Sequence, residues 1–138
     1  MIDRSFPAAT SVLVVEDDFL VRSCAVEFLS DCGFTVLEAD NAPDAMGILE
    51  GAQVDVVFTD VNMPGAFDGL ALARRISHRW PHIAVVITSG RGCPDVEPAC
   101  ARFLPKPYML DTLTRFITEE ASRHARPAAA SGLGRLAG

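Results

Sequence analysis

The chain has 138 residues and a formal net charge of −6, and hydrophobic residues make up 49% of it. This length suits one domain with one core, and the apolar content argues against global disorder. The acidic balance argues against a nucleic-acid partner, which would require clustered Lys and Arg. No apolar run approaches the length of a membrane span and no signal-peptide pattern opens the chain, so we expect no membrane partner either.

The cysteines give a second indication of the environment. They are Cys24, Cys32, Cys93 and Cys100, with no CxxC pair and no His at metal-finger spacing. We therefore expect free thiols in a reducing cytoplasm. Cys24 and Cys32 fall within a helical pattern, which predicts that they serve as small core residues.

Strand and helix patterns alternate between a predicted flexible leader, residues 1–10, and a predicted mobile tail, residues 125–138. The periodicity predicts strands at residues 12–15, 34–37, 54–60, 83–87 and 102–104. Helices are predicted at residues 19–32, from a cap at Asn41 to about Gly51, at 69–79 and at 109–124. Pro94 and Pro98 should leave any helix within residues 91–100 short or irregular.

Each predicted helix has an apolar face that is expected to pack on the strands. Gly33 fits the left-handed position just past the end of the first helix. Strands that alternate with helices indicate a parallel sheet with helices on both faces. The inward residues are predicted to be Val21, Ala25, Phe28, Leu29 and Cys32, then Leu70, Ala73 and Ile76, and finally Leu110, Leu113, Phe116 and Ile117.

Asp60 is the residue most indicative of function. It closes the apolar run 54–60, and Val61-Asn62-Met63-Pro64 follows at once. Open α/β sheets place ligand sites at the C-terminal ends of their strands, so we expect Asp60 to be partly exposed on a rigid element. It could act there as a ligand or a nucleophile, although by itself it could equally be a turn-initiating Asp.

Other polar residues follow three further strands of the predicted sheet. Glu16-Asp17-Asp18 follows the first, Thr88-Ser89 the fourth, and Lys106 the fifth. Alone, these are an acidic helix start, a loop start and a surface charge. A parallel sheet brings them to one edge, where gathered carboxylates repel one another unless a cation is present. Hard oxygen ligands with room for water favour Mg²⁺, and Lys106 and Thr88 would complete a site for an anion such as a phosphoryl group.

The ordered set of motifs resembles the receiver domains of two-component response regulators over residues 11 to about 122. The resemblance implies a flavodoxin-like, doubly wound parallel sheet of five strands in the order 2-1-3-4-5, with the domain at residues 11–124. The matching pieces are Val12–Asp18, Phe58–Pro64, Asp68-Gly69, Ile87–Gly90 and Leu104–Pro107.

The resemblance also implies roles at the matching positions. Asp60 would accept a phosphoryl group from a histidine kinase or phosphotransfer protein, and it would ligate Mg²⁺ together with Asp17 and the Asn62 backbone carbonyl. Glu16 would act through metal-bound water. The remaining implied roles are Thr88 and Lys106 on the phosphoryl oxygens, Thr88 and Phe103 as switch residues, and a cis Lys106–Pro107 bond.

Two features depart from the commonest receivers. Gly65-Ala66-Phe67 places one extra residue between Pro64 and Asp68, which should widen the loop beside Asp60 slightly. The 18-residue spacing from Thr88 to Lys106 is about one helical turn short. The shortening falls on the segment around residues 91–100, so the resemblance implies the phosphorylation site but does not by itself assign the family's output mechanism.

Several functions remain open at this stage. The favoured one is a stand-alone phosphoacceptor that catalyses its own phosphorylation and dephosphorylation and is otherwise not an enzyme. It would act on an unknown downstream protein by contact, or serve as a phosphate shuttle or sink. A receiver that docks without phosphorylation is the main alternative. An aspartyl-phosphate phosphatase would want an Asp at the position of Asn62. A flavodoxin-like nucleotide binder would want a Gly- or hydroxyl-rich loop where Glu16-Asp17-Asp18 stands.

Overall fold

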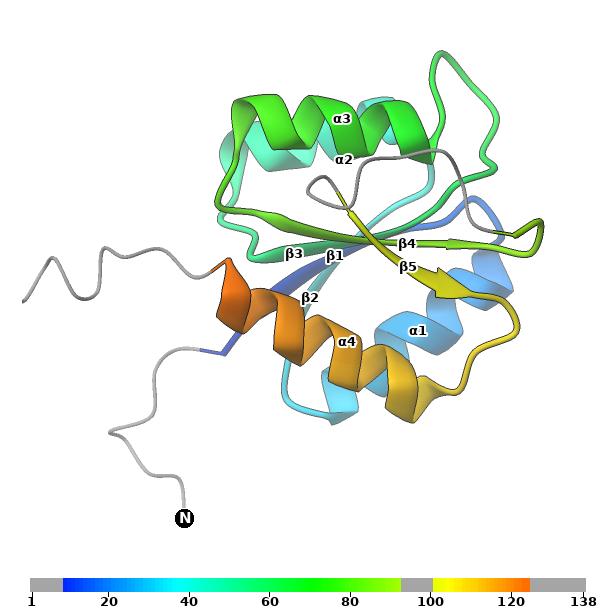
Figure 1. The fold of residues 1–138 in the computed structure, drawn as a ribbon, viewed down its shortest axis with the longest axis vertical. Helices are drawn as coiled ribbons and strands as arrows, with labels where there is room; N and C mark the ends of the chain where they lie inside the picture. Colours follow the sequence, from blue (N-terminus) through cyan, green and yellow to red (C-terminus); the bar gives the residue numbers. More distant parts are fainter. Residues whose placement is uncertain (1–8, 93–100, 125–138) are drawn as a thin grey trace, which may run out of the picture.

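Five parallel strands form the centre of the protein in the computed structural model, which describes residues 9–92 and 101–124 (Figure 1). Their order in the sheet is β2-β1-β3-β4-β5, which confirms the predicted doubly wound fold. The strands are β1 (Ser11–Val15), β2 (Thr35–Ala39), β3 (Val56–Asp60), β4 (Ala84–Ser89) and β5 (Arg102–Pro105). The helices are α1 (Phe19–Asp31), α2 (Ala42–Gly51), α3 (Gly69–Arg79) and α4 (Leu110–Arg123).

The helices cover both faces of the sheet. Figure 1 shows α2 and α3 on one face and α1 and α4 on the other. Successive residues of a strand point to opposite faces, so Leu13 of β1 packs with the α2 and α3 side while Val14 packs with the α1 and α4 side. This double burial explains why the central strands are continuous apolar runs rather than alternating ones.

Helix α1 buries a narrower face than the sequence predicts. Ala25 and Leu29 are buried, whereas Cys24 and Cys32 are exposed, so the prediction that these cysteines are core residues is wrong. Cys24 directly precedes Ala25 and points about 100° away from it around the helix, and Cys32 lies beyond the last helical turn. Val21, in the first turn, is also exposed rather than inward.

Polar side chains fix where the helices begin. The Asp18 carboxylate accepts a hydrogen bond from the Val21 N–H at 3.1 Å, and the Asn41 side chain accepts one from the Asp44 N–H at 2.8 Å, as predicted for Asn41. Asp68 caps α3 in the same way. Such caps stabilise a helix by about 1 kcal/mol each. Because each cap follows a strand end, it also sets the path of a loop at the C-terminal edge of the sheet.

Some predictions fall on parts of the chain outside the described ranges. The predicted short helix within residues 91–100 lies almost wholly outside them, as do the leader at residues 1–10 and the tail at residues 125–138.

Gly33 has a φ of 102°, as expected just past the end of α1. Within residues 9–92 and 101–124, no helix combines the length and apolarity that a membrane crossing requires.

Candidate functional site at the carboxyl edge of the sheet

The fold brings the predicted site residues to one edge. Asp60 is the last residue of β3 and lies beside Thr88 in the register of β3 and β4. Lys106 directly follows β5, and Glu16 and Asp17 directly follow β1. Thr88 and Ser89 lie within β4 and are buried, rather than following the strand as the sequence suggested.

Asp60 is held by two partners. Its Oδ2 lies 2.7 Å from the Lys106 Nζ, and its Oδ1 accepts a hydrogen bond from the Asn62 N–H at 3.0 Å. Asp60 is only 7% exposed, so the expectation of partial exposure is wrong, because the Lys106 side chain reaches it from the loop after β5. The Lys106–Pro107 bond in that loop is cis, as expected.

The edge carries an excess of negative charge. Burial, with the nearby charge of Asp60 and a hydrogen bond to Asp17, raises the pKa of Glu16 to about 7 against the opposing hydrogen bond from Asp18. Burial of Lys106 would lower its pKa, but its hydrogen bond to Asp60 and the surrounding carboxylates raise the pKa above the ordinary value. One amino group therefore faces several carboxylates, an arrangement that a bound cation would relieve.

Thr88 presents an unpaired hydroxyl at this edge. It is 2% exposed, and its Oγ1 has no hydrogen-bond partner among the described residues. Its backbone carbonyl, by contrast, accepts a hydrogen bond from the Val61 N–H at 3.0 Å. Leaving a buried hydroxyl unpaired costs about 1 to 3 kcal/mol, so the hydroxyl is ready to bind an acceptor that reaches this place.

The donor set fits Mg²⁺ better than a transition metal. No three Asp, Glu, His or Cys side chains in the described parts of the chain gather closely enough to hold a metal by themselves. Mg²⁺ is usually bound by one or two carboxylates with several waters, which Asp17 and Asp60 together with a backbone carbonyl such as that of Asn62 can provide. Asp17 also lines an open groove of about 650 Å³ with Pro64 and Gly65, which gives solvent access to this side of the edge.

Phe103 lies on β5 and packs on the core. It pairs in register with Ile87 and packs, partly buried, against the hydrophobic core between the sheet and helices α2 and α3. Core packing alone explains an aromatic residue at this position. The role of Phe103 as a switch residue stays a prediction.

The sequence did not reveal three other contributors to the site. Tyr108 packs edge-on against Phe58 at 5.7 Å between ring centroids, and burial together with the charges of Glu16 and Asp60 raises the pKa of its hydroxyl to about 12. Arg22 of α1 hydrogen-bonds the backbone carbonyl of Glu16. Gly69 packs directly against the backbone carbonyl of Asp60. The sequence motif Asp68-Gly69 contains this glycine but does not reveal the contact.

The fold and this edge together define a receiver-type domain of two-component signalling. The chain belongs to the response regulator receiver domain family, whose model matches residues 12–118. It is 37% identical over 122 residues to the sensor kinase CckA of Brucella abortus (strain 2308), covering 80% of this chain and 12% of that protein. It is 35% identical over 127 residues to the transcriptional regulatory protein FixJ of Bradyrhizobium diazoefficiens (strain USDA 110), covering 87% of this chain and 60% of that protein.

Among solved structures, the chain is similar to the response regulator TrrA of Thermotoga maritima, solved in complex with Mg(2+)-BeF. The TM-score is 0.74 at 23% identity, covering 80% of this chain and 97% of that one. At this identity the likeness supports the fold alone. The chain spans less than two thirds of the length of the curated relatives named above.

Proposed function

We propose that the protein is a phosphoacceptor. Asp60 would receive a phosphoryl group from the phosphohistidine of a histidine kinase or phosphotransfer protein, in a reaction that depends on Mg²⁺. The observation that carries the proposal is the Asp60–Lys106 pair at 2.7 Å beside the unpaired hydroxyl of Thr88. A carboxylate nucleophile, a cation and a spare hydrogen-bond donor are the groups that such a transfer needs.

Each group has a role in this chemistry. An Asp60 oxygen forms the new bond to phosphorus as the bond to the histidine nitrogen breaks. Lys106 then pairs with the phosphoryl oxygens, and the Thr88 hydroxyl donates to one of them, which ends its unpaired state. Asp17, Asp60 and the Asn62 carbonyl would hold Mg²⁺, with Glu16 acting through a metal-bound water. The metal supplies charge neutralisation, which is the main requirement of phosphoryl transfer.

The phosphodonor must approach over the rim of the site, because Asp60 itself is buried. The first turns of α1 and α4 form part of this rim, and both carry exposed apolar side chains: Phe19 and Leu20 on α1 and Met109 at the start of α4. We infer that the donor protein packs on these side chains while its phosphohistidine reaches Asp60. Exposed apolar groups of this kind favour a protein contact.

The signal would pass on by contact with a further protein. The relatives include a sensor kinase and a transcriptional regulatory protein. The exposed free thiols of Cys24 and Cys32 are consistent with a reducing, cytoplasmic location.

The intact mass after incubation with acetyl phosphate tests the proposal. Wild type with Mg²⁺ should gain the mass of one phosphoryl group, whereas wild type with EDTA and Asp60→Asn with Mg²⁺ should gain none. If neither wild type nor Asp60→Asn gained mass, the proposal would be refuted and a receiver that docks without phosphorylation would be favoured.

A further inference from the structure

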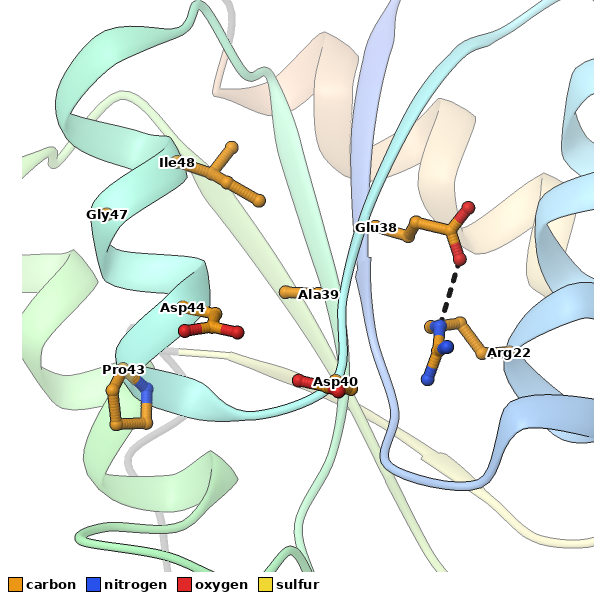
Figure 2. Close-up of a pocket in the computed structure, with 8 residues that line it drawn as sticks. All are labelled: Arg22, Glu38, Ala39, Asp40, Pro43, Asp44, Gly47 and Ile48. Carbon is orange, nitrogen blue, oxygen red and sulfur yellow. Dashed lines mark hydrogen bonds and ion pairs between the residues drawn. The ribbon is translucent and has the colours of Figure 1, made fainter.

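Arg22 joins the start of the loop after β1 to the C-terminal part of β2. Its Nη1 donates to the Glu16 backbone carbonyl at 2.7 Å, and its Nε donates to the Glu38 carboxylate at 2.9 Å. Figure 2 shows the guanidinium of Arg22 directed from α1 toward Glu38 on β2. Both residues line a groove of about 610 Å³. The Arg22 side chain is only 14% exposed, so its position is well restricted.

The two hydrogen bonds of the Glu16 backbone decide how the chain leaves β1. The Glu16 N–H donates to the Ala39 carbonyl at 3.1 Å, and the Glu16 carbonyl accepts from Arg22. Asp17 follows directly, and Asp18 then caps α1. The backbone is therefore held on both sides of Asp17, by the hydrogen bonds of Glu16 and by the capped start of α1. This restricts the direction of the Asp17 side chain.

We propose that Arg22 is a positioning residue for the divalent cation, acting through the Glu16 backbone and oriented by Glu38. This inference rests on the proposed function, since it concerns the residues that would hold Mg²⁺. Partners one step removed from metal ligands commonly govern affinity by fixing the orientation of those ligands. Glu38 also balances the guanidinium charge, which would otherwise repel a cation.

A purely structural ion pair elsewhere in the chain provides the comparison. Arg79 and Glu50 join α3 to α2 at 2.7 Å, and both side chains are about half exposed, at 53% and 54%. Exposed pairs of this kind contribute about 0 to 1 kcal/mol to stability, and this one touches no predicted ligand. Arg79→Ala therefore removes an Arg–Glu pair without touching the site.

Calorimetric titration with Mg²⁺, together with the rate of acetyl phosphate labelling at increasing Mg²⁺, tests the proposal. Arg22→Ala should raise the Kd for Mg²⁺ about tenfold while the labelling rate at saturating Mg²⁺ stays near wild type. Arg22→Lys keeps the charge but cannot bridge both acceptors, so it should also bind Mg²⁺ more weakly. Arg79→Ala should match wild type in both measurements.

The outcomes separate the two proposals. Wild-type Mg²⁺ affinity in Arg22→Ala, or an equal loss in Arg79→Ala, overturns the role of Arg22 alone. Absence of Mg²⁺ binding and labelling in the wild type overturns the proposed function and this inference with it. If Arg22→Ala does not fold, Glu38→Ala decides, because Glu38 is half exposed and the substitution removes the acceptor that orients the guanidinium. It should raise the Kd for Mg²⁺, by no more than the roughly tenfold expected of Arg22→Ala, and an unchanged Kd overturns the proposal.

Discussion

Replacing Gly69 with alanine tests how closely the start of α3 supports the phosphoacceptor. A Cβ at this position would overlap the backbone carbonyl of Asp60 and come within 3.0 Å of the Val61 Cα. Both neighbours are backbone atoms of β3 and the residue after it, so neither can move aside by a rotamer change. The end of β3, and Asp60 with it, must shift.

The expected loss can be set against a matched glycine. Overpacking of this kind costs about 1 to 3 kcal/mol of the free energy of unfolding. Gly47 lies within α2, where an added Cβ would meet no atom within 4 Å, so Gly47→Ala should instead stabilise the protein. The gain should be about 0.5 to 1 kcal/mol, from the higher helix propensity of alanine. The two variants should therefore differ by about 1.5 to 4 kcal/mol.

Urea unfolding followed by circular dichroism measures this difference. Gly69→Ala should show a lower midpoint with an unchanged slope, and slower acetyl phosphate labelling because Asp60 is displaced. Gly47→Ala should show a higher midpoint and wild-type labelling. If Gly69→Ala were as stable as Gly47→Ala, the close contact between α3 and the Asp60 carbonyl would not exist in solution.

Three further predictions concern the site itself. The side-chain resonance of Lys106, the only lysine in the chain, should titrate above pH 10.5 in wild type and at lower pH in Asp60→Asn, which keeps the burial but loses the carboxylate partner. Because the pKa of Lys106 is raised in the folded protein, the Lys106–Asp60 pair stabilises the fold below pH 10.5, and this contribution is lost as the pH rises through the folded pKa. Identical titrations of Lys106 in wild type and Asp60→Asn would contradict the contact. Thr88→Val should keep the free energy of unfolding within about 1 kcal/mol of wild type, or raise it, because it removes an unpaired hydroxyl. The same variant should gain less thermal stability from beryllofluoride with Mg²⁺, and an equal gain would exclude Thr88 as a phosphoryl ligand. Leu20→Ser should slow transfer from a phosphohistidine donor but not from acetyl phosphate, and equal slowing of both would refute a docking role.

The sheet and its polar edge were predictable because the signals are local. Strands buried on both faces appear as continuous apolar runs, and parallel topology then collects residues such as Asp60, Thr88 and Lys106 at one edge. Neither step needs knowledge of side-chain packing.

The burial of Asp60 was not predictable in this way. It involves the contact with Lys106, which lies 46 residues further along the chain. The contact from Arg22 to Glu38 is likewise set by the packing of α1 beside β2. Cys24 and Cys32 are exposed because α1 buries only a narrow face. Apolar residues occur on several sides of this helix, so the sequence alone does not show which side is buried.

The most direct test of the account is to locate the phosphoryl group. The protein is labelled with acetyl phosphate and Mg²⁺, the acyl phosphate is reduced with borohydride, and the peptides are analysed by mass spectrometry. The account predicts a single modified residue, Asp60, whose labelling is abolished by EDTA. Modification at Glu16 or Asp17 instead, or no modification of wild type under conditions in which it binds Mg²⁺, would contradict it.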